Sequence, residues 1–168
     1  MSVGDVNSTE RGSGARYNDG KVPFDLLPLT ILADTLPAGL VRTAMALLGL
    51  FQETADIKYL HALFNTLGAQ GGMEECARVM DYGSRKYAAW NWAKGMAWSI
   101  PLACAARHLW AMAFVDPLDP ESGLPHRGHV FANVVMLLTF QRTFPEGNDL
   151  PVQLRDQPGY PFPALPTE

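Results

Sequence analysis

The side chains best suited to chemistry lie in one segment of the sequence, residues 116–133. Its Pro- and Gly-rich loop, DPESGLP, carries two carboxylates and a hydroxyl, those of Asp119, Glu121 and Ser122. Two imidazoles and an amide follow at intervals of i, i+3 and i+7, those of His126, His129 and Asn133. On an α-helix this spacing places all three on one face.

The rest of this predicted helix is apolar, with Val130, Phe131 and Val134 among its residues, so we expect the polar face to be interior. Imidazole and amide groups inside a protein need polar partners. A divalent metal ion with its waters, held between facing helices, would satisfy them. The alternative is structural: His126 lies near solvent, and His129 forms a hydrogen bond with a backbone carbonyl.

The preceding predicted helix offers a second set of polar groups, because Cys104, Arg107 and His108 share one of its faces. A cysteine and a histidine at i, i+4 can bind a metal, whereas the guanidinium of Arg107 is better suited to phosphate or carboxylate. The alternative assigns Cys104 to the core, His108 to a local hydrogen bond and Arg107 to a salt bridge.

The helix expected at about residues 74–87 should carry charged side chains of both signs on its polar face. Glu74–Arg78 and Asp81–Arg85 are i, i+4 pairs in the favourable order, which is typical of a solvated helix surface. Glu75 lies on the neighbouring stripe. The three carboxylates are also candidates for metal binding or acid–base chemistry.

Two segments combine aromatic and basic residues. The first, which we call the aromatic–basic loop, is residues 86–96 and contains Lys86, Trp90, Asn91, Trp92 and Lys94. The second lies near the N-terminus and lacks the Gly-x4-Gly-Lys-Ser/Thr pattern of a P-loop; its candidates are Arg16, Tyr17 and Lys21. Aromatic faces with cations suit a nucleobase and its phosphates. The alternative is aromatic packing between helices or subunits.

The elements that must position these groups are helices. Apolar residues recur at helical spacing and sustained period-2 alternation is absent, so the sequence predicts an all-α fold. We expect a four- to five-helix bundle with extended N- and C-terminal tails. The helices should span about 41–51, 56–67, 74–87, 99–115 and 125–144. Gly68, Gly71 and Gly72 should end the second, and Ser99 should cap the fourth, with Pro101 in its first turn.

The chain divides into three parts. Residues 1–20 form a polar segment with the RYNDGK motif, 21–144 form a helical catalytic-type domain, and 145–168 form a Pro-rich C-terminal arm. Within the domain, 27–70 is an added helical element. The prolines of the arm are incompatible with an α-helix, and its Leu154, Tyr160 and Phe162 suit packing on another subunit.

Composition narrows the classes of function. The chain has 13 Lys+Arg and 17 Asp+Glu, a net charge of -4 that gives no electrostatic reason for direct binding to nucleic acid. A charged fraction of only 18% indicates further buried surface, most simply in a homo-oligomer. We expect no membrane span and no secretion signal. Cys76 and Cys104 are expected to be buried thiols in a reducing cytoplasm.

Several of these segments form one ordered pattern. They are ARYNDGK at 15–21, YGSRKY at 82–87, NW-x-KGM at 91–96, RHLWA at 107–111 and LDPESGLPH at 118–126, followed by His129 and Asn133. The pattern resembles the phage family of dATP/dGTP diphosphohydrolases, which is placed beside the MazG-like all-α nucleotide pyrophosphatases. The resemblance covers residues 14–24 and about 73–141.

The resemblance implies hydrolysis of a purine deoxynucleoside triphosphate to the monophosphate and pyrophosphate, with a divalent metal. It also implies a phage-encoded protein that acts in the host cytoplasm. Members of the wider MazG-like group hold Mg²⁺ through acidic residues, but here His126 and His129 stand at the second acidic position. Imidazoles suit transition metals better than they suit Mg²⁺, so Mn and Co are candidate ions in addition to Mg.

The expected site therefore has three parts. The metal ligands are Glu74, His108, Asp119, His126 and His129. The catalytic residues are Glu75, Asp81 and Glu121. The substrate-binding residues are Arg16, Tyr17, Lys21, Lys86, Trp90, Asn91, Trp92, Lys94 and Arg107. The alternative function is a non-enzymatic nucleotide-binding or virion-associated interaction protein on the same helical scaffold.

Overall fold

α-Helices dominate the structure, as the sequence predicts. The computed structural model describes residues 2–154 and 158, and these are all-α apart from one pair of two-residue strands. The six α-helices are α1 (Leu29–Thr35), α2 (Leu40–Thr54), α3 (Lys58–Thr66), α4 (Ala69–Lys86), α5 (Ser99–Phe114) and α6 (His126–Thr143). The described residues thus contain one helix more than expected, because the sequence pattern predicts no helix before residue 41, where α1 lies.

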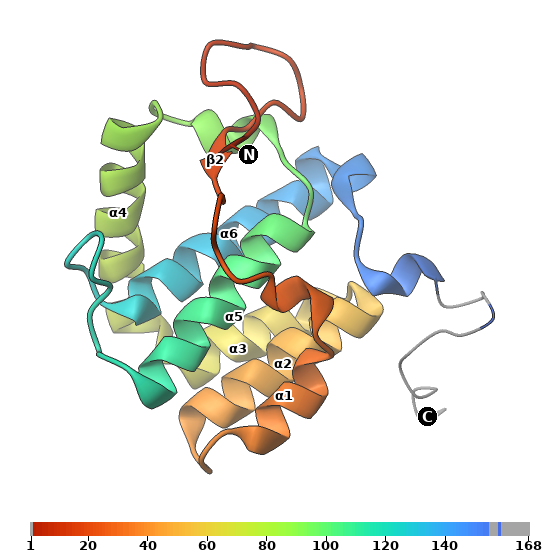
Figure 1. The fold of residues 1–168 in the computed structure, drawn as a ribbon, viewed down its shortest axis with the longest axis vertical. Coiled ribbons are helices and arrows are strands. Elements are labelled where there is room, and N and C mark those ends of the chain that lie inside the picture. The colour runs from red at the N-terminus through yellow and green to blue at the C-terminus, as the bar shows by residue number, and fades with distance from the viewer. Residues whose placement is uncertain (1, 155–157, 159–168) are drawn as a thin grey trace.

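A crossing pair of helices, α5 and α6, lies at the centre of the molecule (Figure 1). α4 packs against one side of α6, whereas α2 packs on α5 and α3 packs on α2. α1 lies on the outside of α2. Because α6 is covered from several directions, most of its residues are buried, polar ones included.

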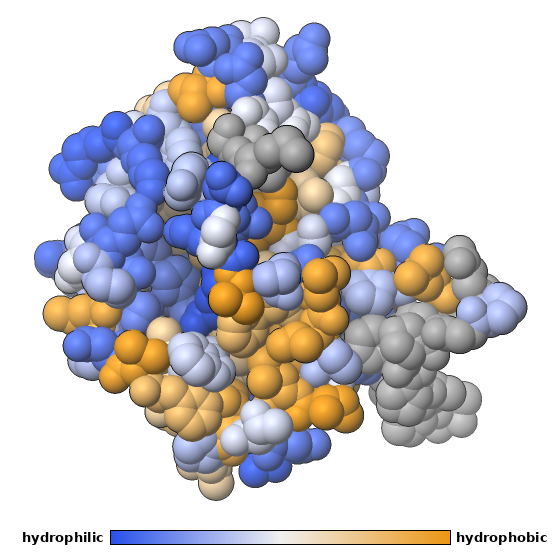
Figure 2. Space-filling view, in the orientation of Figure 1, coloured by the Kyte–Doolittle hydropathy of each residue, from blue (hydrophilic) through white to orange (hydrophobic). Residues whose placement is uncertain are grey.

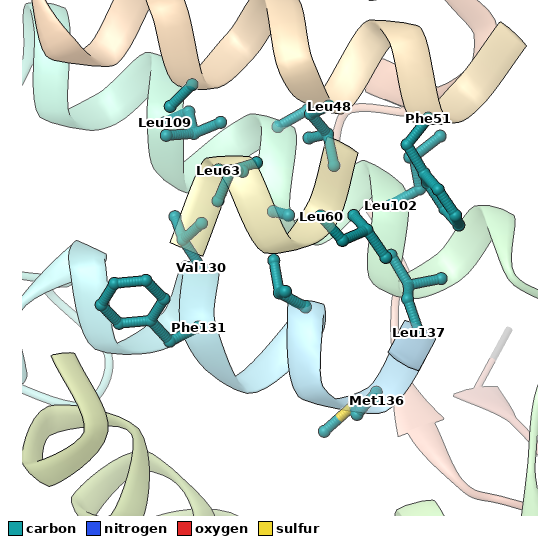
Figure 3. Packing of buried hydrophobic residues seen from close by; sticks show 14 of the residues in the cluster. Leu48, Phe51, Leu60, Leu63, Leu102, Leu109, Val130, Phe131, Met136 and Leu137 are labelled. Carbon is teal, nitrogen blue, oxygen red and sulfur yellow. The ribbon is translucent and has the colours of Figure 1, made fainter. Parts of the chain in front are cut away.

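The apolar core fixes the position of α6. Figure 3 shows Leu60 and Leu63 of α3 lying between α2 and α6, near Leu48 of α2. These three side chains are completely buried. Phe64 of α3 packs on Phe131 of α6 with ring centroids 4.2 Å apart. Full burial of one such side chain contributes about 1.5–3 kcal/mol, so this layer holds α6 firmly against the added element.

The N-terminus of α5 is capped by a distant residue. Ser99 is the first residue of the helix instead of its N-cap. Its N–H and its hydroxyl both donate to the carboxylate of Asp149, at 2.8 and 2.6 Å. Pro101 lies in the first turn as expected, where its missing N–H costs nothing. The capping partner is 50 residues away, so local sequence signals could not identify it.

The turn between α3 and α4 is tighter than the sequence predicts. Gly68 separates the two helices with a left-handed φ of 83°. Gly71 and Gly72, which were expected to end the preceding helix, belong to α4. A Cβ added to Gly72 would lie 1.4 Å from the ring of Phe131. The absence of a side chain at Gly72 therefore allows α4 and α6 to approach closely.

The N-terminal segment, residues 2–21, is part of the folded body. β1 (Ser2–Val3) pairs antiparallel with β2 (Arg16–Tyr17) at one end of the helices. From β2 the chain crosses in front of α5 to the 3-10 helix η1 (Phe24–Leu26) (Figure 1). The segment thus covers part of the helical body.

The chain after α6 forms two short 3-10 helices, η3 (Pro145–Gly147) and η4 (Pro151–Leu154). The prolines exclude an α-helix here, as expected, but short 3-10 turns accommodate them. Leu150 is buried and Val152 packs against the core. The remainder of the expected C-terminal arm lies outside the described residues, except for Pro158.

One face of the molecule carries exposed apolar side chains. We call this face the apolar patch; its large exposed residues are Val22, Leu26, Leu27, Ile31, Trp110 and Phe114. Figure 2 shows hydrophobic residues gathered over the region of η1 and α1. The ring of Trp110 contacts Phe24 and Phe114, with centroids 6.2 and 5.7 Å apart, and so joins η1 to α5.

Two expectations from composition concern the membrane and the cysteines. Among the described helices, none combines the length and the hydrophobicity that a membrane span requires. Cys76 and Cys104 are both buried free thiols, as predicted.

The close approach of α4 and α6 can be tested with two glycines of α4. Gly72→Ala should lower the free energy of unfolding by about 1–3 kcal/mol, because its methyl group overlaps Phe131. Gly83→Ala should instead raise it by about 0.5–1 kcal/mol, since nothing lies within 4 Å of its Cβ position. Urea denaturation of both variants checks this, and equal effects would contradict the packing.

Candidate active-site cavity

A cavity opens between α4 and α6. Its volume is about 490 Å³, which is in the range of small-molecule sites, about 300–1,000 Å³. The N-terminal segment and the aromatic–basic loop line it from above, while α5 and the loop between α5 and α6 supply its polar side. The wall from α4 and the middle of α6 is largely apolar. The cavity therefore suits a ligand with one polar and one apolar part.

Two imidazoles face each other across the α5–α6 crossing. Nδ1 of His108 lies 2.7 Å from Nδ1 of His126. With a carboxylate oxygen of Asp119, these ligand atoms all lie within 4.8 Å of one another. Nε2 of His126 is buried and has no partner among the described residues. Two facing imidazole nitrogens need a shared proton or a cation, so this group fits a metal ion.

A hydrogen-bond chain links Asp119 to His129 through Ser122. The Ser122 hydroxyl lies 2.8 Å from Oδ2 of Asp119 and 2.8 Å from Nε2 of His129, and it accepts from the N–H of Leu124. A carboxylate can only accept, so the hydroxyl donates to Asp119. Nε2 of His129 must then donate to Ser122 Oγ. This leaves Nδ1 of His129 with a free lone pair.

Burial sets the charge state of the cluster. It lowers the pKa of His129 to about 4, and the neighbouring His108 adds to this effect. Burial, together with His108, also lowers the pKa of His126. Burial alone would raise the pKa of Asp119, but hydrogen bonds from Ser122 and the nearby His129 outweigh it and lower that pKa. At neutral pH these two imidazoles are neutral and the carboxylate is ionised, as metal ligands must be.

Two lysines share one carboxylate at the cavity wall. Nζ of Lys86 contacts Oε1 of Glu121, and Nζ of Lys21 lies 3.3 Å from Oε2. The hydroxyl of Tyr82 donates to Oε1 at 3.4 Å. The hydrogen bond from Lys86 is the main reason that the pKa of Glu121 is lowered, with Lys21 adding to it. All four side chains line the cavity, so Glu121 offsets part of the positive charge of the two lysines.

Arg16 reaches the cavity from β2. Its guanidinium donates to Sδ of Met136 at 3.4 Å and to Sγ of Cys104 at 2.8 Å. Burial alone would raise the pKa of Cys104, but Arg16 and His108 bring it well below the usual value. A guanidinium has five N–H donors, and the two contacts with sulfur leave three of them for other acceptors. Arg16 therefore retains capacity to bind an anion inside the cavity.

The aromatic–basic loop clamps the backbone on both sides of Arg16. The Asn91 amide accepts from the N–H of Ala15 at 3.1 Å and donates to its carbonyl at 2.8 Å. The hydroxyl of Tyr87 accepts from the N–H of Tyr17 at 2.9 Å. Asn91 is buried. Its side chain thus holds β2 in place instead of presenting the amide to a ligand.

Lys94 also holds the N-terminal segment in place. Its Nζ donates to the carbonyls of Asp5 and Val6, at 3.3 and 3.0 Å. Its own carbonyl accepts from the N–H of Gly12 at 2.6 Å. Lys94 therefore braces residues 5–12 and does not line the cavity. We call Tyr87, Asn91 and Lys94 the N-terminal clamp.

The apolar side of the cavity is rich in methionine and tryptophan. Its methionines are Met73, Met80, Met96 and Met136. Trp92 is half-buried and packs on Phe140, with ring centroids 6.5 Å apart, whereas Trp90 is 73% exposed. Flexible thioethers and an aromatic face provide an adaptable surface for a planar ring.

Several expected site residues lie elsewhere. Glu74 and Asp81 are exposed and pair with Arg78 and Arg85, as the solvated-surface alternative describes. Both oxygens of Glu75 accept from Arg127 of α6, at 2.7 and 2.8 Å, which ties α4 to α6.

Arg107 is also outside the cavity lining. It donates to the carbonyl of Val22 at 2.9 Å and to Oδ1 of Asn18 at 3.3 Å. Arg107 and the carboxylates Glu74, Glu75 and Asp81 therefore lie apart from the groups that the cavity brings together. The residues that it does combine are Arg16, Tyr17, Lys21, Lys86, Trp90, Asn91, Trp92, His108, Asp119, Glu121 and His129.

Three residues of the site are absent from the expected set. Tyr82 and Tyr87 both belong to the YGSRKY motif, and Ser122 lies three residues after Asp119. The YGSRKY motif and the Asp-x-x-Ser spacing could have identified these three residues from the sequence alone. Their partners, Glu121, Tyr17 and His129, are set by the tertiary fold.

The fold and cavity define an all-α protein with a cavity lined by basic side chains, imidazoles and carboxylates. A family model described as dATP/dGTP diphosphohydrolase, N-terminal, matches residues 52–150. The chain belongs to this family, whose name is that of a hydrolase. The matched range includes His108, Asp119, His126 and His129, but it begins after Arg16. No curated protein and no solved structure matches the chain.

The N-terminal clamp can be tested by hydrogen exchange. Asn91→Ala removes the acceptor of the Ala15 N–H, so that amide should exchange at least tenfold faster. Lys94→Ala should accelerate exchange around residues 5–12 and leave Ala15 protected, because its contacts lie there. Mass spectrometry of peptides covering residues 2–20 distinguishes the two patterns. Unchanged exchange at Ala15 in Asn91→Ala would contradict the clamp.

Proposed function

We propose that this protein hydrolyses purine deoxynucleoside triphosphates, dATP and dGTP, to the monophosphate and pyrophosphate. One observation carries the proposal: a group that fits a metal, His108, Asp119 and His126, meets a cavity through its members His108 and Asp119. The same cavity also receives Arg16, Lys21 and Lys86. Family membership supports the choice of substrate. The phage origin and the host cytoplasm stay predictions from the sequence.

The residues present fit a divalent metal. His108, His126 and Asp119 would hold it, since one ligand atom from each lies within 4.8 Å of the other two. Nitrogen ligands favour Mn or Co over Mg. When bound, the ion supplies Lewis acidity to the phosphate oxygens.

The chain's own residues have separate tasks in this proposal. Arg16, Lys21 and Lys86 bind the phosphates and balance their charge. Nδ1 of His129, which has a free lone pair, accepts a proton from the attacking water. The ionised Asp119 stabilises the resulting imidazolium through Ser122, which fixes the orientation of the ring.

The apolar side of the cavity receives the purine. Trp92 and the methionines contact the ring by shape and dispersion. Such a surface accepts either purine, which agrees with a site that handles both dATP and dGTP.

Product analysis tests the function. Each of dATP, dGTP, dCTP and dTTP is incubated with Mg²⁺, Mn²⁺ or Co²⁺, and pyrophosphate is measured. We expect release from the two purine substrates, with a loss of at least 100-fold in kcat/KM in His108→Ala and His126→Ala. His61→Ala, an exposed histidine of α3, is the control and should retain activity.

Two results would contradict this function. Wild-type turnover in both cluster variants would make the histidines structural. A rise in Tm with dGTP but no release of pyrophosphate would favour the alternative, a nucleotide-binding protein without catalysis.

We also propose that the chain forms a homo-oligomer through the apolar patch, with a second copy as the occupant. Contiguous exposed apolar surface of this kind marks interaction sites on soluble proteins. The low charged fraction of the chain supports a further buried surface.

Light scattering tests the assembly. The wild type should have a multiple of the 18.4 kDa mass of one chain, and Ile31→Glu should shift it toward that mass, because a charge at the interface is costly. The Tm of the isolated chain should change little, since Ile31 is 60% exposed. A wild-type monomer at micromolar concentration would exclude this interface.

A further inference from the structure

The position of Glu121 is unusual for a carboxylate beside a cavity that binds phosphates. Three donors converge on its carboxylate. Lys21 comes from the N-terminal segment, and Tyr82 and Lys86 both come from α4. Asp119 and Glu121 are the acidic residues among those lining the described cavity. Glu121 therefore occupies the position between Lys21 and Lys86 in which an anion could bind. We call this position the Lys21–Lys86 seat.

We propose that Glu121 is an internal competitor for a polyphosphate, held in the Lys21–Lys86 seat until the ligand displaces it. Carboxylate and phosphate oxygens are equivalent acceptors for an ammonium group, so the two cannot share the seat. The inference rests on the proposed function for its substrate. It assigns Glu121 a role different from the catalytic one expected from the sequence.

The local structure allows Glu121 to leave without unfolding the loop. Its side chain is 44% exposed and so are, in part, those of Lys21 and Lys86. Ion pairs at such exposed positions are weak. The loop itself is held by other contacts, because Asp119 accepts from Ser122 and its N–H donates to the carbonyl of Leu124 at 2.9 Å. Rotation of the Glu121 side chain is therefore sufficient.

The competitor has a consequence for which anions occupy the seat. It lowers the affinity of every anion for the seat by the same factor, so the ratio of two affinities is unchanged but each anion needs a higher concentration to bind. Free phosphate or pyrophosphate has little else to contact, whereas a nucleotide also gains the apolar side of the cavity and Arg16. Glu121 thus excludes small anions, and its return to the lysines after hydrolysis favours release of pyrophosphate.

Calorimetric titration with inorganic pyrophosphate tests the proposal in metal-free protein, with EDTA present. Glu121→Gln keeps the shape of the side chain and removes its charge. Pyrophosphate should bind this variant about 3- to 20-fold more tightly than the wild type, because the competing ion pairs are lost. The control is Glu146→Gln, an exposed glutamate that pairs with Arg11 of the N-terminal segment outside the cavity lining. This variant should bind pyrophosphate as the wild type does.

A second comparison places the effect at the seat. In a Lys86→Met background, Glu121→Gln should produce less than half of its original gain, since one of the two lysines is absent. Unchanged or weaker binding of pyrophosphate to a folded Glu121→Gln variant would overturn the proposal. The outcome is independent of turnover: tighter binding without dGTP hydrolysis refutes the proposed function alone. Hydrolysis with unchanged binding refutes the competitor alone.

Discussion

The burial of α6 is the constraint on which the rest of the structure depends. This helix is covered by α3, α4 and α5, so each polar side chain on it must find its partner inside the protein. Arg127 is paired with Glu75, Asn133 donates to the carbonyl of His129, and His129 is joined to the loop through Ser122. Two atoms are exceptions, because Nε2 of His126 and Oδ1 of Asn133 have no partner within the described residues. One of these two unsatisfied groups, His126, belongs to the cluster that fits a metal.

The second requirement is the N-terminal segment, which completes the cavity from outside the helical core. Its attachment depends on the aromatic–basic loop: Asn91 and Tyr87 hold the backbone on either side of Arg16, and Lys94 holds residues further back. The clamp thus positions the backbone of Arg16, while its guanidinium is held by Cys104 and Met136 instead of by a carboxylate. The guanidinium can meet a phosphate without first losing a carboxylate partner. Lys21 and Lys86 differ, since both are paired with Glu121 in the structure.

Much of the fold follows from sequence, but the site follows only in part. Helical spacing on α6 placed His126, His129 and Asn133 on an interior face, and all three are buried. Spacing could not show that His108 meets His126, because that contact depends on how α5 crosses α6. Asn91 lies in a loop whose composition is typical of ligand binding, yet both ends of its amide bond to the backbone of Ala15. Glu74 and Asp81 had two interpretations, and only their exposure on α4 separates them. In each case the missing information is a long-range contact.

The central claim is that one cavity brings together a metal-binding cluster and the phosphates of a purine nucleotide. Its most direct test is a crystal of the protein with Mn²⁺ and a non-hydrolysable dGTP analogue, measured at a wavelength where manganese scatters anomalously. The account predicts an anomalous peak among Nδ1 of His108, Nδ1 of His126 and the carboxylate of Asp119. The phosphates should contact Arg16 and the two lysines, with the Glu121 carboxylate turned away. A manganese peak on the Glu74 face of α4, or a nucleotide bound outside the cavity, would contradict it.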